Sequence, residues 1–258
     1  MRLPILEGVI RRRVLVNYRV DPHLLERLLP SPFRPKLQNG AAVAGICLIR
    51  LEEIHPAFVP LRVGFASENA AHRIAVVWRD EGGPHEGVFI PRRDTGSFLN
   101  HLAGGRLFPG EHHRATFAVA TAGDSIDLHM QSRDGGVTVR VKGRVAGALP
   151  SQSVFASIAE ASKFFEPGAL GYSVTREPHK LHGIRLETQG WHVEPLHVDE
   201  VASSYFDDAA RFPTGTALFD SALIMRDIRH RWHAADDLYA LPTCKGALLG
   251  SWQRRSDS

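Results

Sequence analysis

The sequence predicts an α+β protein that is mainly β, with an antiparallel, barrel-like sheet and a few short flanking helices. Several segments alternate apolar and polar residues, which is the period of a half-buried strand. Hairpin-length connections join them, and such connections favour antiparallel pairing over βαβ units. Roughly nine or ten strands are expected, a number that favours strong curvature or closure around a pocket.

The N-terminal part of the chain predicts a strand, a short helix and a second strand. Residues 14–20 form the first strand, and Asp21-Pro22 supplies a helix cap followed by a first-turn proline. The helix carries a stripe of four leucines and ends at a run of prolines. Residues 41–51 are apolar and compatible with a buried strand.

The middle of the chain predicts two hairpins. Residues 67–78 and 87–92 pair through a turn at 80–84, and residues 126–130 and 137–141 pair through a turn at 133–136. Between the hairpins, Asp94-Thr95 is suited to cap a short helix over 98–103.

The C-terminal part mixes both kinds of element. We expect a helix at 153–165, strands at 181–187 and 191–198, a helix at 200–210, and one long strand or two within 216–232. The whole chain, residues 1–258, is expected to be one domain with a core of about 14–233 and a flexible tail at 246–258.

Composition limits the class of partner. The chain has 31 Lys and Arg against 28 Asp and Glu. This small excess of positive charge does not indicate a nucleic-acid-binding protein. Cys47 and Cys244 lie far apart without a C-x-x-C pattern, and we expect a reduced, cytoplasmic protein. The longest strongly apolar run, residues 41–49, is too short to span a membrane, so no membrane association is expected.

Known catalytic and cofactor motifs are missing from the sequence. The 14 histidines show no HExxH or His-x-His spacing, so we expect no metal. No GxSxG, P-loop or GxGxxG pattern occurs, and we expect no cofactor. Any mechanism that needs a lysine has only five candidates: Lys36, Lys142, Lys163, Lys180 and Lys245.

Polar residues are dense in one part of the otherwise apolar pattern. One interpretation is a solvated rim at strand ends; the other is a pocket mouth, where Arg and His bind an anionic group and a carboxylate orients them. The residues concerned are Glu68, Asn69, His72, Arg73, Arg92, Arg93, Asp94, Gly105, Arg106, Glu111, His112, His113 and Arg114.

At these residues the sequence resembles the acetoacetate decarboxylase-like superfamily, most closely its uncharacterised bacterial branch, known as a domain of unknown function. The resemblance spans about residues 14–232. It is carried by Tyr18-Arg19-Val20-Asp21-Pro22, Leu29-Pro30, residues 67–78, Gly87 to Thr95, Ala103 to Phe108, and Phe219-Asp220-Ser221-Ala222-Leu223.

The resemblance implies an antiparallel barrel-like sheet around a largely apolar pocket. The family's decarboxylases form a Schiff base on a lysine beside a second lysine. Laid without gaps, these positions fall on His113 and Arg114, and histidine has no primary amine to condense with a ketone. We therefore expect no Schiff-base decarboxylation. Arg19 matches the family's N-terminal substrate-site arginine, and its acidic residue falls on Ala70, two residues after Glu68.

Two hypotheses about function remain open. In the first, the pocket takes a small carbonyl- or carboxylate-bearing molecule, and the protein is a lyase, tautomerase or hydrolase. His113 or His112 acts as general acid/base with Glu68, and the arginines hold the substrate, namely Arg19, Arg114, Arg73 and Arg92. In the second, the barrel is a non-catalytic small-ligand-binding module. The cations also suit a subunit interface, and we expect a homo-oligomer.

Overall fold

The computed structural model describes residues 4–59, 65–97 and 110–240, and it is mainly β. It contains a 13-stranded sheet and the helices α1 (Pro22–Leu28) and α3 (Ile158–Phe165). The strands are β1 (Leu6–Val20), β2 (Arg34–Pro35), β3 (Leu37–Gln38), β4 (Ala41–Pro56), β5 (Phe65–Asp80), β6 (Gly83–Thr95), β7 (His112–Ala122), β8 (Ser125–Ser132), β9 (Thr138–Val145), β10 (Leu170–Val174), β11 (Lys180–Thr188), β12 (Glu194–Ser203) and β13 (Ala217–Tyr239).

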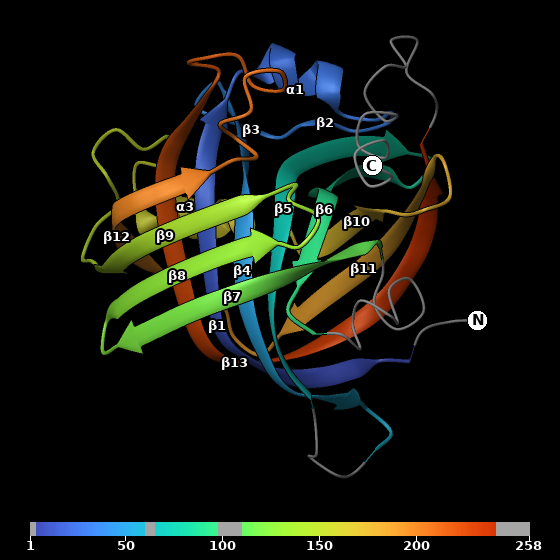
Figure 1. The fold of residues 1–258 in the computed structure, drawn as a ribbon. Helices are drawn as coiled ribbons and strands as arrows, with labels where there is room; N and C mark the ends of the chain where they lie inside the picture. The colour runs from blue at the N-terminus through green and yellow to red at the C-terminus, as the bar shows by residue number, and fades with distance from the viewer. Residues whose placement is uncertain (1–3, 60–64, 98–109, 241–258) are drawn as a thin grey trace.

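The strand pairings close two barrel-like rings that share one wall (Figure 1). The shared wall is β13-β1-β4-β5-β6. One ring is completed by β7, β8, β9 and β12, and we call it the large ring. The other is completed by β10 and β11, and we call it the small ring. Strand β13 is long enough to pair with β1, β11 and β12.

The shared wall is buried on both faces, because alternate residues of its strands enter different hydrophobic cores. In β4, Ile46 and Leu48 belong to the core that extends into the large ring, whereas Cys47 and Ile49 belong to the core beside α3. The same division separates neighbouring residues in β1, β5 and β13. In the middle of these wall strands, two adjacent residues therefore reach different compartments.

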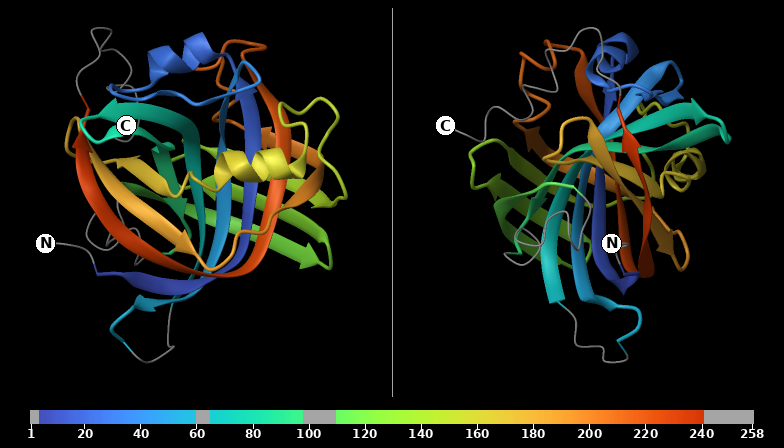
Figure 2. Two further views of the ribbon diagram at one scale, coloured as in Figure 1. Left: turned by 180° about the vertical axis from the view of Figure 1, so that it is seen from behind. Right: turned by 90° about the vertical axis from the view of Figure 1, so that its right-hand side faces the viewer.

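The two helices cover different parts of the sheet. Helix α1 lies over one end of the molecule, and α3 crosses the face of the wall beside β10 and β11 (Figure 2). Asp21 caps α1 by accepting a hydrogen bond from the Leu24 N–H, and the predicted leucine stripe is buried. Phe164 and Phe165 of α3 pack against the wall.

The predicted strands and both hairpins are confirmed, but the sheet is mixed rather than wholly antiparallel. Strand β6 runs parallel to β7 and to β10. A parallel pair needs a long connection, and 16 residues separate β6 from β7 in the sequence. The segment 216–232 is one strand, extended to residue 239. The helix expected over 98–103 and the tail at 246–258 lie outside the described residues.

The predicted helix at 200–210 is wrong. Its first residues complete β12 and pair with β9, and the following turn buries Tyr205 and Phe206 in the aromatic core. The backbone there is a series of turns. Local sequence propensity does not predict this pairing of β12 with β9, because the two strands are far apart in the sequence.

The helix predicted at 153–165 begins later than expected, at Ile158 rather than Ser153. The Ser153 hydroxyl and the Val154 N–H both donate to the Asp220 carboxylate, at 2.8 Å each. These contacts hold the preceding residues in turns and bends, and Ser157 caps the helix. Neither helix in the described part of the chain is long and apolar enough to span a membrane.

Close packing of β1 on β4 predicts that Gly45→Ala destabilises the protein. A Cβ at Gly45 would overlap the backbone carbonyl oxygen of Val16. We expect a loss of about 2 kcal/mol in the free energy of unfolding, measured by urea denaturation. Gly147→Ala is the control, because Gly147 is exposed with nothing within 4 Å of the added carbon. Equal stability of the two variants would contradict this account of the packing.

Candidate functional site

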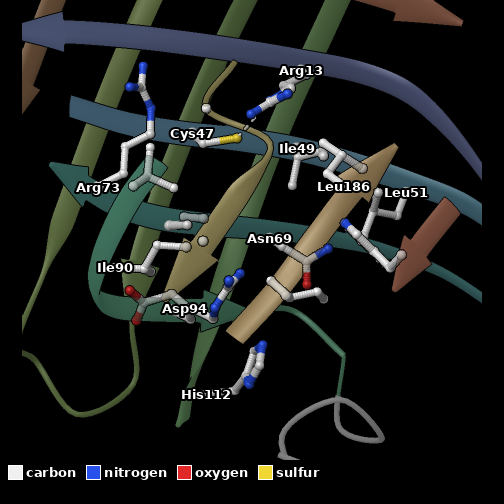
Figure 3. A pocket seen from close by; sticks show the side chains of 18 of the residues that line it. Arg13, Cys47, Ile49, Leu51, Asn69, Arg73, Ile90, Asp94, His112 and Leu186 are labelled. Carbon is white, nitrogen blue, oxygen red and sulfur yellow. Dashed lines mark hydrogen bonds between the residues drawn. The ribbon is translucent and has the colours of Figure 1, made fainter. Parts of the chain in front are cut away.

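A cavity opens inside the small ring, between the shared wall and β10–β11 (Figure 3). The space it encloses, together with the solvent at its mouth, is about 900 Å³. Most of the lining is apolar, and it comprises Ile49, Leu51, Ala70, Ala71, Val88, Ile90, Gly168, Ala169, Gly171, Ile184, Leu186 and Trp232. Polar groups enter this lining at a few positions.

Three arginines line the cavity, one from each of three strands of the shared wall. Arg13 comes from β1, Arg73 from β5 and Arg93 from β6. Each side chain is held by a neutral group. The Arg73 Nη2 donates to Asn17 Oδ1 at 2.6 Å, and the Arg93 Nε donates to Ser173 Oγ at 2.9 Å.

Arg13 is the third member of this set. Its Nε lies 3.3 Å from the Cys47 Sγ, and its Nη1 lies 3.9 Å from the Met225 Sδ. Its guanidinium also lies 5.9 Å from the centre of the Trp191 ring. None of the three arginines pairs with a carboxylate in the part of the chain that the structure describes.

The positive charge of this group is costly to keep without a counter-ion. Arg73 is 4% exposed, its Nε has no hydrogen-bond partner, and its guanidinium lies 4.8 Å from the centre of the Phe165 ring. Burial lowers the pKa of Arg73 and that of Arg93 to about 10, so both are protonated at neutral pH. A buried cation is stabilised by an anion that enters its surroundings.

Asp94 and His112 also line the cavity. The Asp94 carboxylate already has a cationic partner, because Arg92 Nε and Nη2 donate to it at 2.8–3.2 Å. Burial raises the pKa of Asp94, and Arg92 opposes that effect. The His112 ring lies at the start of β7, with Nδ1 3.3 Å from the Gly110 carbonyl oxygen. The cavity therefore combines cations, one matched carboxylate and one imidazole.

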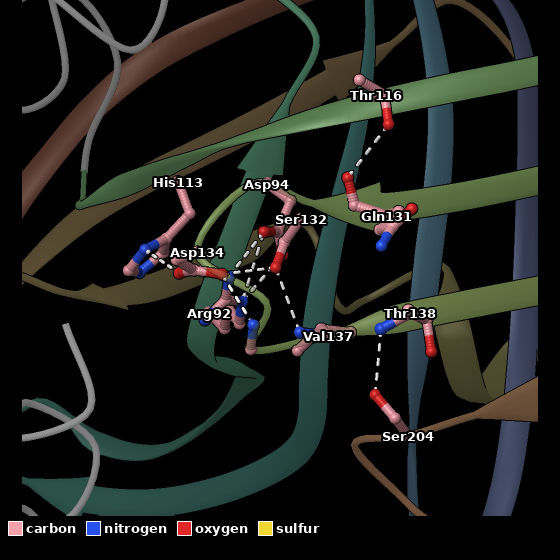
Figure 4. A network of polar contacts seen from close by, with 11 residues as sticks. Arg92, Asp94, His113, Thr116, Gln131, Ser132, Asp134, Val137, Thr138 and Ser204 are labelled. Atoms are coloured by element: carbon pink, nitrogen blue, oxygen red, sulfur yellow. Dashed lines mark hydrogen bonds and ion pairs between the residues drawn. The ribbon is translucent and has the colours of Figure 1, made fainter. Parts of the chain in front are cut away.

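His113, the neighbour of His112, belongs to a different cluster (Figure 4). Its Nδ1 lies 3.0 Å from Asp134 Oδ2. Arg92 bridges Asp134 and Asp94, with an Nη2 to Asp134 Oδ2 distance of 2.8 Å, and the Ser132 hydroxyl donates to Asp134. This arrangement, in which each charge has a partner, is typical of a structural network at a strand end.

The pKa values in this network follow from its contacts. Burial opposes ionisation of Asp134, but hydrogen bonds from Ser132, the Gly136 N–H and Arg92 together hold its pKa well below the ordinary value. Burial and the charge of Arg92 lower the pKa of His113, and the neighbouring carboxylates oppose that shift. Asp134 is therefore ionised at neutral pH.

The remaining predicted site residues do not line the cavity. Glu68 is paired with Arg12, at 2.6 Å between Oε2 and Nη2, and its side chain lies in the register of wall residues that enter the large ring. Arg19 donates to the Gln152 carbonyl oxygen at 3.0 Å. Arg114 lies on β7 opposite Thr95. Of the seven predicted residues, the structure brings only Arg73 and His112 to the cavity.

Sequence reasoning missed Arg13 and Cys47 and gave no role to Arg93. A signal for the first existed in β1, where Arg13, Leu15 and Asn17 alternate with the apolar residues of the other face. A cation placed between buried residues on such a face indicates a functional or structural need. Cys47 lay within a continuous apolar run, where no sequence pattern marks a cavity.

No lysine lines the cavity in the described ranges. Lys36 borders a smaller pocket next to it, which shares Arg13 and Arg73. The Lys36 amine is 2.7 Å from Glu86 Oε2 and donates to the Phe164 carbonyl oxygen at 3.0 Å.

Comparison with protein families identifies the chain over most of its length. Residues 9–217 match the model of DUF2071, described as an uncharacterized conserved protein. The chain belongs to this family. No curated protein matches the sequence.

Solved structures with a similar fold support the resemblance stated from the sequence. An acetoacetate decarboxylase-like enzyme from Sphingomonas wittichii matches with a TM-score of 0.57 and 12% identity, covering 93% of this chain and 94% of the other. Acetoacetate decarboxylase from Legionella pneumophila matches with a TM-score of 0.58 and 13% identity, covering 91% and 88%. The enduracididine biosynthesis enzyme MppR, complexed with pyruvate, matches with a TM-score of 0.55 and 12% identity, covering 93% and 91%. The fold of this DUF2071 protein is thus acetoacetate decarboxylase-like.

The network around Asp134 predicts a pH-dependent contribution to stability. Asp134→Asn removes a carboxylate from Arg92 and His113, and we expect a loss of about 2 kcal/mol at pH 7. Because the folded-state pKa is depressed, the contribution is complete above the ordinary value of 3.8 and is lost progressively as pH falls from there through the depressed folded-state pKa, so it is smaller near pH 3 than at pH 7. Urea denaturation at pH 7 and near pH 3 measures both values.

Asp199→Asn is the matched control, because Asp199 makes an exposed ion pair with Arg144. It should change stability little at either pH. A loss for Asp134→Asn that is the same at both pH values would contradict the assigned role of the carboxylate.

Proposed function

We propose that this protein binds a small molecule with a carboxylate and an apolar body in the cavity of the small ring. The observation that carries the proposal is the set of three arginines that lack a carboxylate partner among the described residues, in an otherwise apolar lining. A carboxylate accepts paired hydrogen bonds from guanidinium groups and balances their charge. The apolar walls contribute affinity by burying the rest of the ligand.

The structural relatives give independent support to a carboxylate ligand. MppR was solved with pyruvate, which is a short keto acid. The similar fold and the arginine-lined cavity together make keto acids the first class of ligand to test. Phenylpyruvate is a suitable probe, because it joins a keto acid to an aromatic ring.

Binding of phenylpyruvate is expected to depend on Arg73. Arg73→Gln keeps a polar side chain but removes the charge, and we expect affinity to fall about 10- to 100-fold, measured by isothermal titration calorimetry. Phenylacetone, which carries a methyl group in place of the carboxylate, should bind the unmodified protein at least about ten-fold more weakly than phenylpyruvate.

Arg144→Gln is the control for a general change in charge, since Arg144 is exposed and pairs with Asp199. This variant should bind phenylpyruvate as the unmodified protein does. Equal affinity for phenylpyruvate and phenylacetone, or unchanged affinity in a folded Arg73→Gln variant, would refute the proposal.

A second candidate function is proton transfer to or from the bound keto acid by His112. The position of His112 in the cavity lining supports it, because an imidazole beside a bound carbonyl compound is suited to exchange a proton at the adjacent carbon near neutral pH. Such a site would make the protein a lyase or a tautomerase without a Schiff base. The alternative is a binding module without catalysis.

His112→Gln and His113→Gln form a matched pair that separates catalysis from binding. We expect the protein to accelerate exchange of the phenylpyruvate methylene protons with D₂O, followed by NMR. His112→Gln should reduce this rate about 100-fold with little change in affinity, whereas His113→Gln should retain it. If the protein does not accelerate exchange above the rate in buffer, catalysis is refuted and the non-catalytic binding module is the remaining function. Borohydride trapping of the ligand on a lysine would favour Schiff-base chemistry instead.

A further inference from the structure

Cys47 is a free thiol in the wall of the cavity that the proposed function does not use. It lies in the middle of β4 and is 8% exposed. Its Sγ lies 3.3 Å from the Nε of Arg13 (Figure 3). The thiol therefore faces the same space that the carboxylate ligand would occupy.

The arginines that line the cavity surround this thiol with positive charge. Arg73 and Arg93 are close enough to Cys47 for their charges to interact with it. The buried Arg73 Nε has no hydrogen-bond partner. The Arg73 guanidinium is therefore incompletely satisfied, in keeping with a cavity that takes an anion.

We propose that Cys47 is a modification site, at which the thiol attacks electrophiles that carry a carboxylate. The inference rests on the proposed function, since the arginines hold the carboxylate and thereby place the electrophilic carbon near Sγ. With iodoacetate, the Sγ–carbon bond forms as the carbon–iodine bond breaks. Iodide leaves with the bonding pair, and the thiol proton passes to the buffer. The product is carboxymethylcysteine.

Charge selectivity separates this proposal from ordinary thiol reactivity. A thiolate repels an anionic reagent, so a cysteine in neutral surroundings reacts no faster with iodoacetate than with the uncharged iodoacetamide. Arginines that bind the carboxylate reverse this order. The ratio of the two alkylation rates therefore reports the proposed site rather than exposure of the sulfur.

The test uses the full chain with Cys244→Ser, so that Cys47 is the remaining cysteine. Intact-mass spectrometry at pH 7 follows alkylation by each reagent. We expect iodoacetate to react about ten-fold faster than iodoacetamide, a ratio that corresponds to about 1.4 kcal/mol of attraction between the reagent's carboxylate and the arginines. Arg73→Gln should bring the ratio to one or below, and adding Cys47→Ser should abolish the modification. If Arg73→Gln does not fold, Arg93→Gln makes the same comparison.

The outcomes distinguish this inference from the proposed function. A ratio of one or less in the Cys244→Ser protein overturns the modification site, and phenylpyruvate binding measured by calorimetry on the same protein then shows whether the carboxylate site stands without it. Slower alkylation of Cys47 in the presence of phenylpyruvate would support both the carboxylate site and the modification site.

Discussion

Burial of the shared wall on both faces is the constraint on which the rest of the structure depends. Strands β13, β1, β4, β5 and β6 close one ring with β7–β9 and β12 and another with β10–β11. The two-residue period of a strand then sends neighbouring side chains to different compartments. In β5 it directs Arg73 to the cavity and His72 to the core of the large ring, and at the start of β7 it separates His112 from His113.

Charge balance distinguishes the two polar regions that this division creates. Around Asp134, guanidinium, imidazole and carboxylate groups satisfy one another, and the cluster contributes to stability. In the cavity, the three arginines donate hydrogen bonds to neutral acceptors, which are an amide oxygen, a hydroxyl and sulfur atoms. The proposed carboxylate ligand would offset this cost, which connects the energetics of the wall to the proposed function.

Local sequence signals predicted the strands, both hairpins and the cap of α1, because period-2 alternation and capping chemistry are properties of neighbouring residues. The helix at 200–210 was wrong because its first residues pair with β9 as part of β12. The site could be predicted only in part. Arg73 and His112 were identified as members of one dense set of polar residues. Glu68 belonged to the same set, and Arg19 was assigned to the pocket from a remote resemblance, but neither lines the cavity. Ring closure decides which face of each strand lines the cavity. Arg13 and Cys47 meet only through the pairing of β1 with β4.

A crystal structure of the protein with phenylpyruvate tests the central claim most directly, because it shows where an anion balances the buried arginines. The account predicts the carboxylate within hydrogen-bond distance of the Arg73 guanidinium and the ring against the apolar lining between β5 and β11. Phenylpyruvate bound in the large ring beside His72, or outside the small ring with the three arginines still lacking an anion, would contradict it.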